Sequence, residues 1–261
     1  MSTTALAAPI RVNTAGVHAR PGLGRLVAVE LRKMVDTRAG FWLQVAMVAL
    51  TVVVVVVRLL VGDAADHTFQ SVLDVGLQPS AVLLPVLGIL LVTSEWSQRT
   101  GLITFALVPV RSRVLGAKLI ASLLLATAML AISVAVVAAG VFVSSPGVEA
   151  TWSDAVPLIG QSAVCLTAGM GVGVALGAIL LAPTPAIAVL LVLPTALWAV
   201  LSLPVFSDVA PWVDRARALG QVTEYVMSAT QWAHVGSSLV IWMVLPLLIG
   251  ARRITRCEVT A

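Results

Sequence analysis

Long apolar runs separated by short polar stretches dominate the hydrophobicity pattern of this chain. Six of these runs approach or exceed ~20 residues, the length that a helix needs to cross ~30 Å of hydrocarbon. Their approximate bounds are residues 41–61, 77–94, 116–143, 155–182, 186–206 and 232–251. The pattern therefore predicts an all-α integral membrane protein with six transmembrane helices.

Composition strengthens this prediction. Hydrophobic residues make up 59% of the chain and charged residues 11%, and the mean hydropathy is +1.04. A soluble domain of this composition would lack the polar surface that keeps it dispersed. The net charge of +4 is therefore attributed to a basic membrane face that suits anionic lipid headgroups, and no nucleic-acid partner is expected.

The distribution of Lys and Arg predicts the orientation. Thirteen of the sixteen basic residues lie before the first run, between the second and third runs, or in the tail at 252–261, and the exceptions are Arg58, Arg215 and Arg217. By the positive-inside rule, both termini of this multi-pass chain are expected in the cytoplasm. Cys165 and Cys257 then lie too far apart to form a disulfide.

The N-terminal region divides into two parts. Residues 1–22 have few apolar runs and predict a disordered cytoplasmic leader, with the first spanning helix acting as the insertion signal. Residues 23–40 have apolar positions at helical spacing, with Glu30, Arg32 and Lys33 on the remaining arc. This predicts an amphipathic helix in the membrane interface, serving as a membrane anchor or as a contact surface for a partner.

The stretch at 93–118 is unusually polar for this chain. A carboxylate at the membrane boundary is followed by a short semi-apolar piece, a proline and then a basic start to the third spanning helix. Two interpretations remain open, a short helix docked on the membrane surface or a solvated loop whose arginines only obey the topology.

Three stretches of the chain resemble the permease subunits of ABC-2 type transporters. They are residues 29–33 (VELRK), residues 94–101 (SEWSQRTG) and residues 109–118 (PVRSRVLGAK). In that family a Glu, an aromatic residue, an Arg and a Gly-Thr pair precede a run that contains Pro, Arg and Lys. This chain has Thr100-Gly101 where Gly-Thr is commoner.

The resemblance implies a half-transporter whose second-to-third loop docks on a cytoplasmic ABC ATPase dimer. It assigns ATPase coupling to Glu95, Trp96, Gln98, Arg99, Thr100, Gly101, Arg111 and Arg113. The sequence has no phosphate-binding Gly-x-x-x-x-Gly-Lys-Ser/Thr motif, so ATP and Mg are expected in the partner, with no cofactor bound by this chain. The chain is not expected to be an enzyme by itself.

The same resemblance implies export across a bacterial cytoplasmic membrane, by this chain paired with a second copy or a related permease. Walls rich in Val, Leu, Ala and Met favour a lipophilic or amphipathic cargo, such as an antibiotic-like compound, another drug-like compound or a lipid.

Several residues within the runs invite a specific interpretation. Gly169, Gly173 and Gly177 lie one turn apart and predict close helix packing. Gln44, Arg58 and Gln161 are candidates for lining a pathway. Arg58 could instead extend its charge to the outer interface, and the glutamines could bond across helices.

The outer side carries further polar features. Residues 207–231 are amphipathic and predict one or two short helices at the outer leaflet. His67 has no second histidine or cysteine at ligand spacing, so it is expected to be solvated and no metal site is predicted. Several of the seven tryptophans lie at the ends of the runs and fit an interfacial belt.

Two other classes of function remain open from sequence. An intramembrane enzyme would draw on His234 and Ser237, which are three residues apart on one helix with no orienting acid. A non-transporting assembly or regulatory membrane subunit is the other alternative.

Overall fold

The described part of the chain is helical. The computed structural model describes residues 22–61, 67–97, 111–144, 152, 154–223 and 225–256, and these residues contain no strand. Six helices are long and apolar enough to span a membrane. The prediction of an all-α integral membrane protein with six spans is confirmed. The predicted leader lies outside the described residues, apart from Gly22.

The helices follow one another in a simple order. An N-terminal helix, α1 (Leu23–Asp36), precedes the first five spans, which are α2 (Arg38–Val61), α3 (Phe69–Ser97), α5 (Arg111–Ser144), α6 (Ala155–Leu180) and α7 (Pro183–Leu201). A 3₁₀ turn η3 (Pro204–Phe206) and two short helices, α8 (Ala210–Val213) and α9 (Arg215–Gly220), come next. The sixth span consists of α10 (Ala229–Leu239), a π-helical stretch η4 (Val240–Val244) and α11 (Leu245–Arg256).

Several helix boundaries differ from the prediction. α3 begins at Phe69, eight residues earlier than the predicted start at 77, and α5 begins at Arg111 instead of 116. Both helices carry polar residues in their first turns, which interrupted the apolar runs. α7 ends at Leu201 instead of 206, because Pro204 opens the 3₁₀ turn. The short helices predicted between the fifth and sixth spans are present as α8 and α9.

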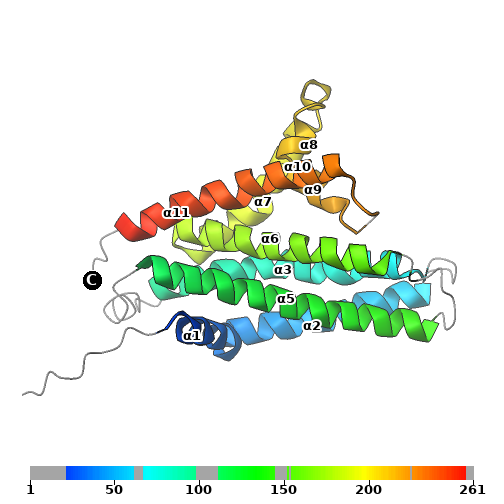
Figure 1. Cartoon of the computed structure of the whole chain (residues 1–261), viewed down its shortest axis with the longest axis horizontal. Coiled ribbons are helices and arrows are strands. Elements are labelled where there is room, and N and C mark those ends of the chain that lie inside the picture. Colours follow the sequence, from blue (N-terminus) through cyan, green and yellow to red (C-terminus); the bar gives the residue numbers. More distant parts are fainter. Residues whose placement is uncertain are drawn as a thin grey trace, which may run out of the picture.

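The spans form a bundle around the pair α3 and α6, with α2, α5 and α11 packed against them (Figure 1). A Cβ at Gly173 would overlap the backbone carbonyl of Pro85, and one at Gly177 would lie 3.1 Å from the carbonyl oxygen of Ile89. From the opposite side, a Cβ at Gly88 would lie 2.6 Å from the carbonyl oxygen of Met170. The small residues therefore let the two backbones touch, which is how helices associate in lipid.

α1 lies across one end of the bundle, where it is seen nearly end-on in Figure 1. The elbow between α1 and α2 is at Thr37, whose hydroxyl accepts a hydrogen bond from Gly40 N at 3.2 Å. The Gln44 side chain donates to the carbonyls of Met34 and Gly40 at 3.0 and 3.1 Å. These bonds satisfy backbone groups exposed by the break and fix the angle between the helices. We refer to this end as the α1 end and to the other as the far end.

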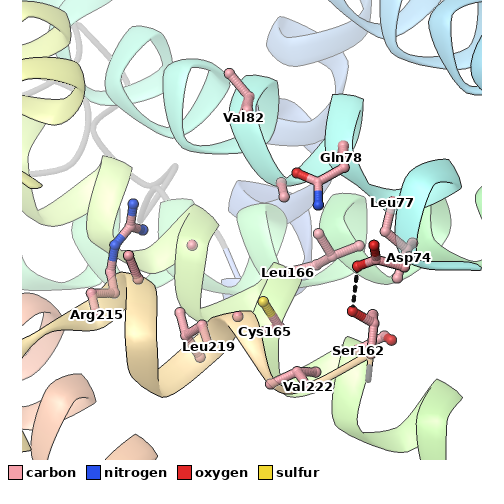
Figure 2. A pocket seen from close by; sticks show the side chains of 15 residues that line it. Asp74, Leu77, Gln78, Val82, Ser162, Cys165, Leu166, Arg215, Leu219 and Val222 are labelled. Carbon is pink, nitrogen blue, oxygen red and sulfur yellow. Dashed lines mark hydrogen bonds between the residues drawn. The ribbon is translucent and has the colours of Figure 1, made fainter. Parts of the chain in front are cut away.

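The far end contains the short helices and a cavity. The chain between α7 and α8 projects from the bundle in Figure 1. A cavity of about 290 Å³ lies between α3, α6 and α9 (Figure 2). The prediction that His67 is solvated is wrong, since it is only 8% exposed at the start of α3. Its two ring nitrogens have no hydrogen-bond partner among the described residues.

Candidate functional site

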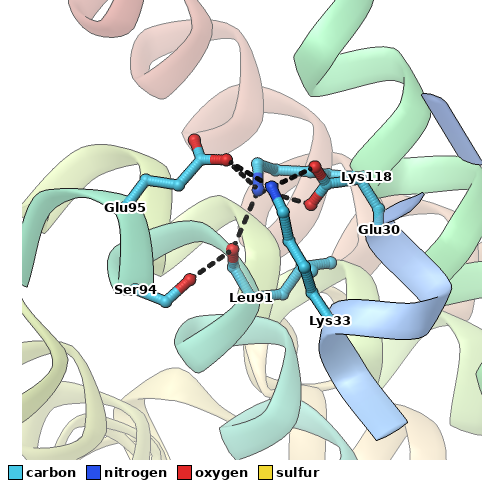
Figure 3. A network of polar contacts seen from close by, with 6 residues as sticks. All are labelled: Glu30, Lys33, Leu91, Ser94, Glu95 and Lys118. Atoms are coloured by element: carbon cyan, nitrogen blue, oxygen red, sulfur yellow. Dashed lines mark hydrogen bonds and ion pairs between the residues drawn. The ribbon is translucent and has the colours of Figure 1, made fainter. Parts of the chain in front are cut away.

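Four charged side chains meet at the α1 end, where α1, α3 and α5 converge (Figure 3). They are Glu30 and Lys33 of α1, Glu95 of α3 and Lys118 of α5. Glu30, Glu95 and Lys118 are 4%, 5% and 3% exposed. Burial of a charge costs several kcal/mol unless it is paired, so these groups depend on one another. We call them the four-charge network.

Lys118 is at the centre of the four-charge network. Its ammonium donates to Glu30 Oε2 at 2.7 Å, to the carbonyl oxygen of Leu91 at 3.1 Å and to Glu95 Oε1 at 3.2 Å. An ammonium has three donors, so all of them are used within the protein. The buried cation is therefore fully bonded without water.

Lys33 closes the network from its exposed side. Its ammonium lies 2.7 Å from Glu30 Oε1 and 3.0 Å from Glu95 Oε1, and its side chain is 38% exposed. The two lysines and two glutamates sum to zero charge. Burial is the largest single influence on the pKa of Lys33 and lowers it, but the two carboxylates together outweigh burial and raise the pKa above its ordinary value.

Local sequence explains why these groups point inward. Val27, Glu30 and Met34 are the buried residues of α1 and follow helical spacing, so Glu30 lies on the buried face between two apolar side chains. The sequence interpretation that placed Glu30 with the solvent-facing arc is wrong. Glu95 lies in the last turn of α3 and Lys118 in the second turn of α5.

Glu95 and Lys118 lie on either side of the chain that joins α3 to α5. Residues 98–110, which we call the connecting segment, join α3 to α5 and lie outside the described residues. Glu95 lies just before the connecting segment and Lys118 just after it. The ion pair between these residues therefore ties the two ends of the connecting segment to each other, and Glu30 and Lys33 tie both ends to α1.

The residues predicted for ATPase coupling divide into three groups. Glu95 belongs to the network, and Trp96 packs beside it against a small apolar cluster that includes Leu115 and Ile254. Arg113 lies half-buried in the first turn of α5. The remaining predictions are outside the described residues, namely Gln98, Arg99, Thr100, Gly101 and the side chain of Arg111.

The residues predicted for the interfacial helix do not all lie at the surface. Arg32 stays at the surface, where its guanidinium lies 3.7 Å from Asp36. Glu30 and Lys33 turn inward to the network, so α1 contacts the bundle through charge as well as through apolar packing.

Sequence reasoning missed Lys118 as a site residue, although a signal existed. The chain has fourteen arginines and only two lysines, Lys33 and Lys118. Both lysines are in the four-charge network. A compact ammonium with three rotatable donors can bond three groups around a point, whereas a planar guanidinium requires more room and a fixed fork geometry. The choice of lysine at two positions in an arginine-rich chain indicates this kind of site.

The candidate pathway residues have defined surroundings. Gln44 bonds to the elbow between α1 and α2 as described above. Gln161 is 4% exposed, donates to the carbonyls of Val222 and Tyr225 at 2.7 and 3.0 Å, and accepts from Met227 N at 2.8 Å. These bonds attach the chain between α9 and α10 to α6. Arg58 lies half-buried near the end of α2. A pathway role for the three residues stays a prediction.

The residues considered for an intramembrane enzyme are engaged in packing. The Ser237 hydroxyl donates to the carbonyls of Trp212 and His234 at 2.8 and 2.9 Å. The His234 ring stacks edge-on against Trp212, with ring centroids 4.5 Å apart. Together with the bond from Trp242 Nε1 to the carbonyl of Val213 at 2.8 Å, these contacts attach α8 to the sixth span.

Comparison with known proteins adds no relative to this description. No protein-family model matches the chain, and no curated protein matches it. The functional argument therefore depends on the residues and their geometry.

Proposed function

We propose that this chain is the transmembrane subunit of an ATP-driven exporter of the ABC-2 type. The observation that carries the proposal is the four-charge network, which joins the helices on either side of the connecting segment. The resemblance implies a contact with the ATPase in and around that segment. A membrane subunit that takes its energy from a partner needs a stiff connection at this point, and buried ion pairs between α1, α3 and α5 provide one.

In the proposed mechanism, ATP binding closes the partner ATPase dimer and displaces the connecting segment. Because Glu95 and Lys118 are bonded to each other and to α1, the displacement moves α1, α3 and α5 together. The bundle then changes the exposure of a cavity formed with a second permease copy or a related permease. ATP and Mg act in the partner, and the work available is limited by the difference in ATP affinity between the two states.

The proposal includes an orientation and a cargo. The α1 end faces the cytoplasm of a bacterial cell, with both termini on that side, because most of the basic residues flank that end. The cargo is lipophilic or amphipathic, such as an antibiotic-like compound or a lipid, in keeping with the apolar spans.

Coupling is tested by co-expressing the chain with a Walker-type ATPase, sought first among the genes that neighbour its own. We expect a stable complex in which the membrane subunit changes the rate of ATP hydrolysis. Glu95→Gln should abolish this change while the complex still co-purifies and the chain still inserts into the membrane. Asp36→Asn is the matched control, because Asp36 is an exposed carboxylate of the same helix as Glu30 and Lys33, and the ion pair it forms among the described residues is a surface pair with Arg32.

Orientation is tested by cysteine labelling. In a chain whose two native cysteines are replaced by alanine, Ser97→Cys should react with a membrane-impermeant maleimide only after the cells are permeabilised. Labelling of intact cells at this position would refute the proposed orientation, and the lack of any complex with the ATPase would refute the coupling.

A further inference from the structure

The cavity at the far end is separate from the four-charge network. Its polar lining comes from Asp74 and Gln78 of α3, Ser162 and Cys165 of α6, Arg215 of α9 and Thr223. Gln78 and Glu95 are both on α3, and their separation of seventeen positions corresponds to about 26 Å along the helix axis. Nothing in the proposed coupling mechanism uses this cavity.

Arg215 supplies a positive charge to this cavity. No hydrogen bond or ion pair of its guanidinium is found within the described part of the chain. The adjacent Asp214 does not neutralise it by contact, because Oδ1 of Asp214 caps α9 through Ala216 N at 2.9 Å and Oδ2 lies 3.5 Å from Arg217 Nε. Burial lowers the pKa of Arg215 and outweighs the opposing influence of the neighbouring Asp214 carboxylate.

Asp74 supplies a negative charge at the opposite end of the same cavity (Figure 2). Its Oδ1 accepts a hydrogen bond from the Thr223 hydroxyl at 2.6 Å, and Oδ2 has no hydrogen-bond partner among the described residues. Gln78 also lines the cavity, and its amide makes no hydrogen bond to another described residue. The cavity thus offers a cation and a carboxylate at separate positions, with an amide available to the same ligand.

The size of the cavity limits the ligand. A volume of about 290 Å³ is at the lower limit of pockets for drug-sized molecules and corresponds to roughly ten water volumes. Val82 lines the cavity and is 51% exposed on the outer surface of α3. Because α3 spans the membrane, this exposed apolar rim would face acyl chains.

We infer that this cavity binds the headgroup of a zwitterionic phospholipid, with the phosphate at Arg215 and the ammonium at Asp74. A phosphoethanolamine headgroup has about eight non-hydrogen atoms, which this volume accommodates. Arginine suits the phosphate because its fork of donors can engage two oxygens at once. A soluble zwitterion has the same charge pattern, but the apolar rim at Val82 favours the lipid. The inference does not depend on ATP coupling.

Native mass spectrometry of the full chain tests this inference directly. The chain is titrated with phosphatidylethanolamine, which has phosphate and ammonium, and with phosphatidylglycerol, which has phosphate only. We expect tighter binding of phosphatidylethanolamine. Arg215→Gln should weaken binding of both lipids by roughly tenfold or more, because it removes a charge-assisted contact. Asp74→Asn should remove only the preference between them.

Arg25→Gln is the charge-matched control, because Arg25 is an exposed arginine of α1 that does not line the cavity, and its replacement leaves the Asp214–Arg217 ion pair intact. Its lipid affinities should equal those of the unmodified chain. If Arg215→Gln fails to fold, the selectivity of Asp74→Asn decides the question.

Three results would overturn the inference. The first is equal binding of the two lipids by the unmodified chain, and the second is unchanged binding by Arg215→Gln. The third is displacement of the lipid by free phosphoethanolamine at an equal concentration, which would identify a soluble zwitterion as the ligand. None of these measurements involves the ATPase, so they leave the proposed function untouched.

Discussion

Replacement of Lys118 by methionine is the most direct perturbation of the four-charge network. Methionine keeps most of the length and volume of the side chain but removes the ammonium. Three hydrogen bonds of 2.7 to 3.2 Å are lost. Glu30 and Glu95, each no more than 5% exposed, then share Lys33 as their only remaining cation in the network.

The magnitude follows from this geometry. Removal of one partner from a buried ion pair costs about 3–5 kcal/mol, because the remaining charge stays buried. Lys33 still contacts both carboxylates and is reachable by water, so we expect about 3 kcal/mol. For a chain of this size, each kcal/mol lowers Tm by roughly 2–4 °C, which gives a decrease of roughly 6–12 °C.

Thermal unfolding in detergent, followed by tryptophan fluorescence, measures this decrease. Lys33→Met is the matched comparison, because water can replace a side chain that is 38% exposed. It should cost only about 1 kcal/mol. The double variant Glu30→Gln with Lys118→Met restores charge balance, since Glu95 and Lys33 remain, and should be more stable than Lys118→Met by about 1–3 kcal/mol. If the double variant is no more stable than Lys118→Met, or if Lys33→Met is equally damaging, the reasoning is refuted.

Three further predictions concern the packing and the pH dependence. Gly173→Ala should lower Tm by several degrees in the same assay, because its Cβ would overlap the α3 backbone, whereas Gly160→Ala has open space at its Cβ and should leave Tm unchanged. Gln161→Leu should accelerate hydrogen exchange at the Met227 amide by at least tenfold, since that N–H loses its acceptor; equal rates would contradict this role. The raised pKa of Lys33 means that its stabilisation is complete below its ordinary value of 10.5 and is lost as pH rises through the folded-state pKa. Tm should therefore fall above pH 10.5, and less steeply in Lys33→Arg.

The sequence was sufficient to predict the spans because hydrocarbon thickness imposes a minimum apolar length. It was less informative about where the helices begin. Gln70, Ser71 and Asp74 made the first turns of α3 look like a loop, whereas the structure places Asp74 along the cavity at the far end. Polar residues at a helix start are compatible with a span when they face protein, and hydropathy does not record which way a side chain faces.

The four-charge network was harder to predict for a related reason. Glu30 and Lys118 are 88 residues apart, and Lys33 and Glu95 are 62 apart. Periodicity reports only on neighbours within one helix, so it assigned Glu30 to the polar arc of α1. The family resemblance identified Glu95 but gave no partner for it. Only the packing of α1 across the ends of α3 and α5 brings the four groups together.

The order in which the network residues appear along the chain has a consequence for biogenesis. A ribosome delivers Glu30, Lys33 and Glu95 to the membrane before it delivers Lys118. The first three residues together carry a net charge of −1, so the nascent network is unbalanced until the third span arrives. Insertion of α5 in the correct register then neutralises it. A chain interrupted before Lys118 would leave a carboxylate without its counter-ion, a defect that cellular quality control could detect before the remaining three spans are made.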